Sequence, residues 1–212
     1  MELRDGRLTI GRVVESGVVR ELAMRRAGLR TVPGWVGALA ELEGLAMLDL
    51  GHNLLTSLPD GVGGLESLEV LYLGDNRLGS LPAAIGGLRR LRYLGLAQNR
   101  LATLPEPVTE LSELVELRLA GNGLRALPAS IGRLRLLREL DLRDNALTSL
   151  PDQIGDLGSL RVLDLRANRL TSLPDSVAGL RNLVKLDLRW NTLVDLPQPA
   201  RRLAAAGCVV WL

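Results

Sequence analysis

Apolar residues recur along this chain in a fixed order, and leucine fills most of the apolar positions. Residues 65 to 86 show the order in full as LxxLxxLxLxxNxLxxLPxxIG. Leu71 and Leu73 alternate with residues of other kinds, which predicts a short β-strand whose leucines point into a core. Ile85, Leu88 and Leu91 follow at three-residue spacing, which favours a short 3₁₀ or α-helical turn.

The same order returns every 23 residues, and one asparagine marks each copy. A fixed period of this length predicts an array of stacked supersecondary units. A side-chain amide where the chain leaves the strand can pair with backbone groups that would otherwise be buried without a partner. We therefore expect a structural ladder without a binding role. Its members are Asn53, Asn76, Asn99, Asn122, Asn145, Asn168 and Asn191.

This unit resembles the leucine-rich repeat, and the resemblance covers roughly residues 16 to 200. The LPxxIG ending is similar to the intracellular repeats of Scribble-type and plant Ras-group proteins and their bacterial relatives. The resemblance implies an α/β solenoid with the shape of a curved horseshoe. A parallel β-sheet would line its concave face, and short 3₁₀ or α-helical turns would form its convex face. It also implies an interaction surface rather than a reaction.

The pattern predicts one continuous domain with atypical ends, since a terminal unit has no neighbour to cover its outer layer. Ala27 takes the place of the asparagine in a degenerate first repeat. The longer step from Pro33 to Pro59 indicates an added convex turn around Leu39 and Leu42. The expected parts are an N-terminal cap (1–15), the degenerate repeat (16–38), seven repeats (39–200) and a C-terminal cap (201–212).

Three segments depart from the regular pattern. Residues 1–15 are expected to fold over the open first layer, and whether residues 8 to 10 form a strand is left open. Residues 106 to 109 replace the usual xxIG and predict a local irregularity in the curvature. In the C-terminal cap, Gly207 is expected to end a helix, and the apolar run after it to form a half-strand in which Trp211 covers the last layer.

Composition narrows the possible partners and the location. The 26 basic and 24 acidic residues leave a net charge of +2, which gives no strong field for nucleic acid or an anionic membrane. Extracellular relatives usually carry disulfide-bearing caps, whereas Cys208 is the single cysteine here. The first residues contain no continuous apolar run. We therefore expect a cytoplasmic protein that binds neither nucleic acid nor membrane.

The residues needed for catalysis are scarce in this chain. His52 is the only histidine, and it lies about seven repeats from Cys208, so a Cys–His dyad, a histidine-based triad and the ordinary zinc sites are not expected. No phosphate-binding glycine motif appears in the required context either. The sequence therefore predicts no enzymatic activity, no cofactor, no metal and no small-molecule substrate.

Strict alternation along the strands identifies the side chains that should line the concave face. A first zone of these residues is neutral and partly aromatic, and its two tyrosines lie on adjacent predicted strands beside glycine and alanine. Tyrosine and methionine are enriched in the cores of protein interfaces. The alternative is that the two rings pack on each other and bind nothing. The candidate residues of this zone are Met47, Asp49, Val70, Tyr72 and Tyr93.

The second zone of the concave face is a lattice of acidic and basic residues on four successive predicted strands. Exposed ion pairs contribute only about 0 to 1 kcal/mol each. The lattice is therefore either a solvated, mutually neutralised surface or a polar docking site with Trp190 as its anchor. Its candidate binding residues are Arg118, Asp141, Arg143, Asp164, Arg166, Asp187, Arg189 and Trp190.

Charges also alternate on the flank of the predicted solenoid from one repeat to the next. Alternation of sign between stacked units favours registration of neighbouring repeats over recognition of a partner. The groups are Arg89, Arg90 and Arg92, then Glu106, Glu110 and Glu113, then Arg133, Arg135 and Arg138.

The sequence thus predicts a non-enzymatic interaction module that binds a protein partner on its concave face. One alternative is a recognition component of a larger signalling system that acts with a kinase or a small GTPase. Another is an engineered repeat scaffold without a natural partner. The 26-residue step and the divergent ends argue against engineering, because a consensus design would equalise them.

Overall fold

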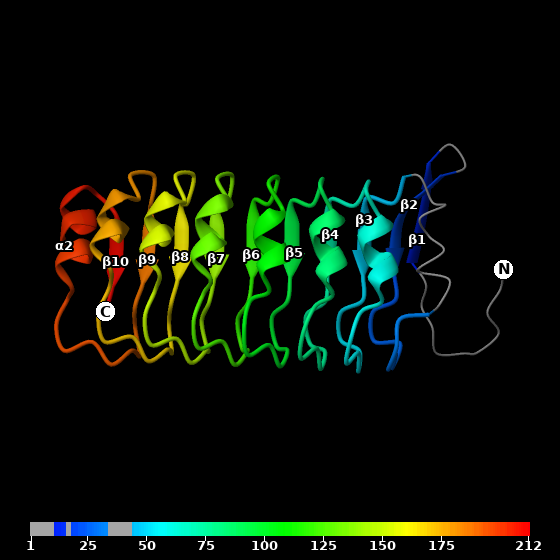
Figure 1. Ribbon diagram of the computed structural model, residues 1–212, viewed down its shortest axis with the longest axis horizontal. Helices are drawn as coiled ribbons and strands as arrows, with labels where there is room; N and C mark the ends of the chain where they lie inside the picture. The colour runs from blue at the N-terminus through cyan, green and yellow to red at the C-terminus, as the bar shows by residue number, and fades with distance from the viewer. Residues whose placement is uncertain (1–10, 16–17, 34–43) are drawn as a thin grey trace.

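The computed structural model describes residues 11–15, 18–33 and 44–212. Ten strands form a single sheet in which each strand lies beside the next one in the chain (Figure 1). The strands are β1 (Gly11–Glu15), β2 (Val18–Ala23), β3 (Met47–Asp49), β4 (Val70–Tyr72), β5 (Tyr93–Gly95), β6 (Glu116–Arg118), β7 (Glu139–Asp141), β8 (Val162–Asp164), β9 (Lys185–Asp187) and β10 (Val209–Trp211).

From β2 to β10 the strands run parallel without a register shift, because each repeat supplies the same alternation. Leu48 is therefore opposite Leu71, and Leu71 is opposite Leu94. All three side chains are completely buried. Each leucine position of the repeat forms a rib along the solenoid, and these ribs together make the core. The predicted leucine-rich repeat solenoid is confirmed.

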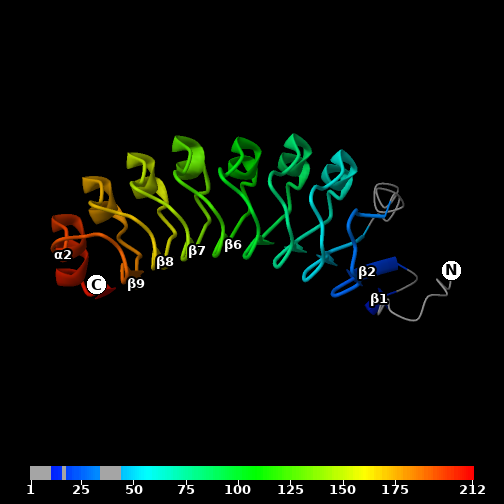
Figure 2. The same cartoon turned by 90° about the horizontal axis from the view of Figure 1, so that it is seen from below.

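Short helical turns form the opposite face of the solenoid. Each begins after a proline in the extended region, such as Pro82 with φ −67° and ψ 152°. Ile85 or its equivalent then inserts into the core. The turns lie on the outer side of the arc in Figure 2 and the strands on its inner side. They are η2 (Asp60–Gly64), η3 (Ala83–Gly87), η4 (Glu106–Glu110), η5 (Ala129–Arg133), η6 (Asp152–Asp156), η7 (Asp175–Gly179) and the longer α2 (Gln198–Ala205).

At the N-terminal end, β1 pairs antiparallel with β2 and covers the edge of the parallel sheet. The degenerate repeat joins the array through Leu22, which is buried opposite Leu48. The possible strand at residues 8 to 10 and the added turn around Leu39 and Leu42 lie outside the described residues.

At the C-terminal end, the expectation that Trp211 covers the last core layer is wrong. Trp211 is the register partner of Asp187 and is 40% exposed, so it continues the concave face. Val210 is the partner of Leu186 and packs against the core instead, together with the buried Cys208. Alternation fixes this arrangement, because neighbours of an inward residue must point outward. Gly207, at φ +95°, makes the turn between α2 and β10.

The irregular repeat at residues 106 to 109 keeps the common framework. η4 has the same five-residue length as the other 3₁₀ turns, and Val108 is buried where the other repeats place isoleucine or valine. Thr109 replaces the usual glycine, and its hydroxyl donates to the carbonyl of Glu106 at 2.7 Å. Strands β5, β6 and β7 stay in register beside it. The unusual residues therefore cause no register shift.

Candidate functional site

The two tyrosines lie in a hollow of about 400 Å³ on the concave face, which we call the tyrosine hollow. The strand register places Tyr93 opposite Val70 and Tyr72 opposite Gly95, so the two rings are diagonal neighbours on β4 and β5. Their centroids are 4.7 Å apart and their planes are tilted by 47°. Tyr72 is 36% exposed. The rings contact each other and still present surface to a partner.

Small residues keep this hollow open. Gly51, Gly74 and Ala97 occupy one column of successive repeats, and all three line the hollow. The ring of Tyr93 lies over Gly95, because a Cβ atom at that glycine would be only 2.9 Å from a ring carbon of Tyr93. A larger residue in these positions would fill the space beside the rings or displace Tyr93.

The other residues predicted for the first zone lie on β3 and β4, and of these Asp49 lines the hollow, whereas Met47 and Val70 do not. Met47 and Val70 are partly buried and form one column with Tyr93. Asp49 accepts the backbone N–H of Gly51 at 2.8 Å, so the turn that follows β3 already occupies part of its carboxylate.

The pKa of Tyr93 is raised to about 12, by burial first and then by the nearby carboxylate of Glu116. The phenol is therefore neutral at physiological pH and offers a partner both a hydrogen-bond donor and an acceptor.

Two further residues at the N-terminal rim of the hollow, Arg25 and His52, were not among the predicted site residues. The Arg25 guanidinium lies 2.6 Å from Nε2 of His52, and Nδ1 of His52 lies 3.5 Å from the carboxylate of Asp75. Arg25 comes from the degenerate repeat, which lacks the asparagine. Aligning its buried Leu22 and Met24 with later leucines would have placed Arg25 on the concave face.

On the other side of the hollow, the charged lattice begins with a network around Arg118. Its guanidinium contacts Glu116 on its own strand at 2.6 Å and Glu139 on the next strand at 2.7 Å. It also approaches Asp141 at 3.7 Å, and Arg143 approaches the same carboxylate at 3.6 Å. The charges are thus paired both within strands and between neighbouring strands.

One of the two expectations for the lattice was a solvated surface, and for its aspartates the structure corrects that expectation. Asp141 and Asp164 are buried, and Asp187 has no exposed surface. The guanidinium of Arg166 lies 2.6 Å from the carboxylate of Asp164 and 3.4 Å from the carboxylate of Asp187. The guanidinium of Arg189 lies 2.7 Å from the same carboxylate of Asp187. The long guanidinium side chains fold over the short carboxylates, so the arginines form the accessible part of this zone.

The covered aspartates differ in their electrostatics. Burial acts to raise the pKa of Asp164, but hydrogen bonds from the side chain and backbone of Arg166 outweigh it and hold the pKa below its ordinary value. For Asp141, burial dominates, and the bond from the backbone N–H of Arg143 offsets it only in part, so the pKa is raised. Ionised Asp164 therefore stabilises the fold, whereas ionised Asp141 carries a cost.

These opposite shifts predict opposite responses to pH. A lowered pKa in the folded state contributes stability above the ordinary value of 3.8, and that contribution is lost as the pH falls through the folded-state value. We expect Asp164→Asn to reduce stability at pH 7 and to approach the wild type below pH 3.8. Asp141→Asn should lower the free energy of unfolding at pH 7 by a smaller amount than Asp164→Asn does. Urea unfolding followed by circular dichroism at pH 7 and pH 3 measures both, and a larger loss for Asp141→Asn at pH 7 would contradict the assignment.

Two tryptophans gather at the C-terminal end of the concave face. Trp190 is 71% exposed, and the guanidinium of Arg189 lies 5.6 Å from its ring centroid. The same guanidinium is 4.7 Å from the ring of Trp211, and the Lys185 ammonium is 4.3 Å from that ring. The predicted anchor Trp190 thus projects outward, and Trp211 joins it as a concave residue that the sequence did not suggest.

The asparagine side chains lie behind the concave face and connect neighbouring repeats. Asn76 is typical: its Nδ2 donates to the carbonyl of Leu73 in its own repeat at 2.9 Å and to Leu50 in the preceding repeat at 3.0 Å. Its Oδ1 accepts the N–H of Leu55 at 3.0 Å. All seven amides accept an N–H from the preceding repeat, through Asn53, Asn76, Asn99, Asn122, Asn145, Asn168 and Asn191.

Metal-binding clusters and membrane-spanning helices are absent from the described part of the chain. No group of three or more His, Cys, Asp or Glu side chains there is placed to hold a metal ion. In the same residues no helix is both long and apolar enough to cross a bilayer. Cys208 is buried, and burial raises the pKa of its thiol, which disfavours the nucleophilic thiolate.

Comparison with known families finds two matching regions. Residues 43–101 match the family described as leucine rich repeat, and residues 129–205 match the one described as leucine-rich repeat region. No protein of curated function matches the sequence.

Solved structures are similar over most of this chain. A leucine-rich repeat protein of Leptospira interrogans, LIC12759, shares 33% identity with a TM-score of 0.80, over 90% of this chain and 53% of its own. This chain therefore spans about half the length of that relative. An internalin (inlF) from Listeria monocytogenes shares 24% identity with a TM-score of 0.69, over 83% of this chain and 50% of its own. At this identity the similarity supports the fold alone. The plant peptide hormone receptor RGFR1, in complex with RGF2, shares 26% identity with a TM-score of 0.58, over 74% of this chain and 30% of its own. The chain is a leucine-rich repeat protein.

Proposed function

We propose that this chain is a non-enzymatic interaction module that binds a segment of a protein partner in the tyrosine hollow. The observation that carries the proposal is the placement of Tyr72 and Tyr93 beside a column of small residues on the concave face. Tyrosine supplies a large contact area at a low cost in side-chain entropy, and interface energy concentrates on such residues. Charged side chains at both ends of the hollow provide a polar rim around this centre.

The geometry of the hollow favours an extended segment that carries an apolar or aromatic side chain. Gly51, Gly74 and Ala97 lie on three successive repeats, and adjacent strands are about 4.8 Å apart. The open column therefore spans roughly 10 Å, enough for about three extended residues at roughly 3.3 Å each. A partner backbone can approach this column closely, while its side chain packs on the rings of Tyr72 and Tyr93.

Similar structures support a protein or peptide partner. RGFR1 is described as a peptide hormone receptor and was solved in complex with RGF2. It shares the fold of this chain over 74% of the residues here. The proposal also includes two finer assignments: membership of the LPxxIG subgroup similar to Scribble-type and plant Ras-group repeats, and a cytoplasmic location. The LPxxIG endings and the single cysteine support them.

The double variant Tyr72→Ala/Tyr93→Ala tests the proposal. We expect capture of the partner from a native lysate to fall at least tenfold, because alanine removes both rings from the centre of the contact. The melting temperature should fall by about 5 °C or less, since a packed aromatic pair contributes about 0.5 to 1.5 kcal/mol. Quantitative mass spectrometry of the captured proteins and thermal unfolding give the two readouts.

A matched control removes exposed apolar side chains away from the concave face. Leu136 and Val194 are both exposed, so Leu136→Ala/Val194→Ala deletes apolar surface without touching the hollow. This variant should capture the same proteins as the wild type. Retained capture by the tyrosine variant, with a large loss of stability, would show that the rings only pack on each other.

A further inference from the structure

A second hollow, of about 580 Å³, lies near the C-terminal end on the edge where the chain enters the strands. Three arginines from successive repeats line it, and they are Arg138, Arg161 and Arg181. Val184 and Gly207 complete its wall. We call it the arginine hollow.

The repeat itself brings these arginines together. Arg138 and Arg161 hold the same position in successive repeats, directly before β7 and β8, and the N–H of Arg161 donates to the carbonyl of Arg138 at 2.8 Å. Arg181 follows η7 one repeat further on. The next step along the solenoid is the turn between α2 and β10, where Ala206 and Gly207 carry no long side chain. The end of the array therefore leaves space beside the guanidinium groups.

No acidic residue is among the residues that line the arginine hollow. Within the described chain, none of its three guanidinium groups has a hydrogen-bond or ion-pair partner. The tyrosine hollow, by contrast, is lined by four acidic residues, and the hollow beside η5 is lined by Glu106 and Asp156. Glu139 follows Arg138 in the chain and lines an adjoining recess, but its carboxylate pairs with Arg118 at 2.7 Å.

This arrangement differs from the expectation that the charged residues on the flank only hold neighbouring repeats in register. Registration requires contact between opposite charges, and Arg138 makes no ion pair within the described residues. Three cations around one space repel each other, so an anion that enters the hollow is stabilised by all of them. Neutral donors are also present, since Ser159 and Asn182 line the same space.

We propose that the arginine hollow binds the phosphoryl group of a phosphorylated serine or threonine in a protein segment. A phosphoryl group carries about −1.5 to −2 charges and three acceptor oxygens, and the planar guanidinium matches it with paired hydrogen bonds. Val184 is 49% exposed beside the arginines and offers apolar contact to residues that flank the phosphate. Mixed polar and apolar walls in a recess fit a peptide better than the flat surface of a bilayer. This site is separate from the tyrosine hollow and does not depend on it.

Calorimetric titration tests the site with a short phosphoserine peptide flanked by alanine and leucine. The wild type should bind this peptide, inorganic phosphate should compete with it, and the unphosphorylated peptide should not bind. Arg138→Gln/Arg161→Gln should weaken binding by at least about tenfold, because charge-assisted hydrogen bonds are lost. Arg181→Gln alone should weaken it by a smaller factor, and higher salt should weaken it in the wild type.

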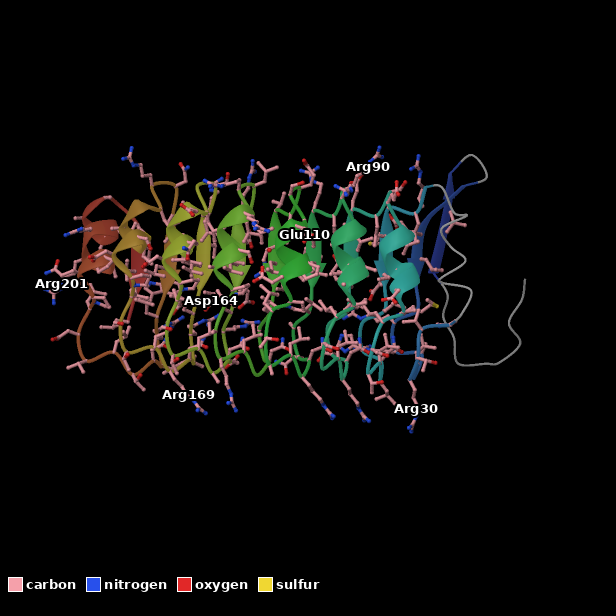
Figure 3. The ribbon with its side chains drawn as sticks, viewed as in Figure 1. Arg30, Arg90, Glu110, Asp164, Arg169 and Arg201 are labelled. Carbon is pink, nitrogen blue, oxygen red and sulfur yellow. The ribbon has the colours of Figure 1, made fainter. Side chains whose placement is uncertain are left out.

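The matched control changes the net charge equally at the other edge of the solenoid. Arg100 and Arg169 are exposed and hold one repeat position. Figure 3 shows Arg169 at the edge opposite to Arg90, which is the repeat equivalent of Asn182 in the hollow. Arg100→Gln/Arg169→Gln should bind the peptide as the wild type does. Equal weakening in this control, equal binding of the unphosphorylated peptide, or binding only to vesicles that contain phosphatidylinositol phosphate would overturn the proposal.

Discussion

Asn168→Ala is expected to lower the free energy of unfolding by about 2 to 3 kcal/mol, because it leaves a buried N–H without an acceptor. The Oδ1 atom of Asn168 accepts the N–H of Leu147 at 3.0 Å. Its Nδ2 donates to the carbonyls of Leu142 and Leu165 at 2.9 and 3.0 Å. Alanine replaces none of these bonds. Urea unfolding monitored by circular dichroism measures the loss.

In Asn168→Ala the N–H of Leu147 loses its acceptor, whereas the two carbonyls each lose only one of two side-chain donors. Leu142 also accepts from Asn145, and Leu165 also accepts from Asn191, so each keeps one donor. The matched control is Asn182→Ala, which removes an exposed amide whose Nδ2 donates once, to the carbonyl of Gly158. It should cost about 0.5 kcal/mol or less. Equal losses in the two variants would mean that the amides behind the sheet contribute no more than a surface residue.

Gly63→Ala is expected to destabilise the solenoid by about 1 to 3 kcal/mol, because the added methyl group has no room between two repeats. A Cβ atom on Gly63 would lie 2.9 Å from the carbonyl carbon and the Cβ of Ala84, and closer still to the carbonyl oxygen. The obstacle is mainly backbone, so no side-chain rotation relieves it. Turns η2 and η3 would have to separate. Thermal unfolding should show a fall of about 2 to 4 °C for each kcal/mol lost.

Gly79→Ala provides the opposite case in a neighbouring repeat. A Cβ atom there would meet nothing within 4 Å, and the glycine is exposed. Alanine restricts the unfolded chain more than glycine does, so this variant should gain about 0.4 to 1 kcal/mol. The two substitutions are chemically identical and are predicted to differ in sign. A gain for Gly63→Ala would show that the convex turns are not in close contact.

The architecture was accessible from the sequence because one physical rule repeats along it. Alternating leucines such as Leu71 and Leu73 can bury their side chains only from a strand, and the proline that follows turns the chain to the other face. The ends were harder to predict. Residues 11 to 15 carry no repeat, so their antiparallel pairing with β2 had no signal in the period. Hydrophobicity alone places Trp211 in the core, whereas the alternation set by the inward Cys208 and Val210 points it outward.

The concave face was less accessible for a different reason. Alternation tells which side chains face outward but not which of them cover others. Asp187 faces outward and is nevertheless fully buried, because the guanidinium groups of Arg166 and Arg189 fold over it. The arginines near the last repeats show the reverse case. Arg161 has no ion-pair partner among the described residues, because its neighbours in the repeat column are Arg138 and the apolar Val184 and neither carries a carboxylate.

We propose the tyrosine hollow as the place where a protein partner docks. The most direct test incorporates the photoreactive residue p-benzoylphenylalanine at position 72 and, separately, at position 194, and irradiates each protein in native lysate. We predict that position 72 becomes covalently linked to the protein that the wild type captures, and that Tyr93→Ala in the same chain reduces the product. A product from position 194 but none from position 72 would contradict the claim.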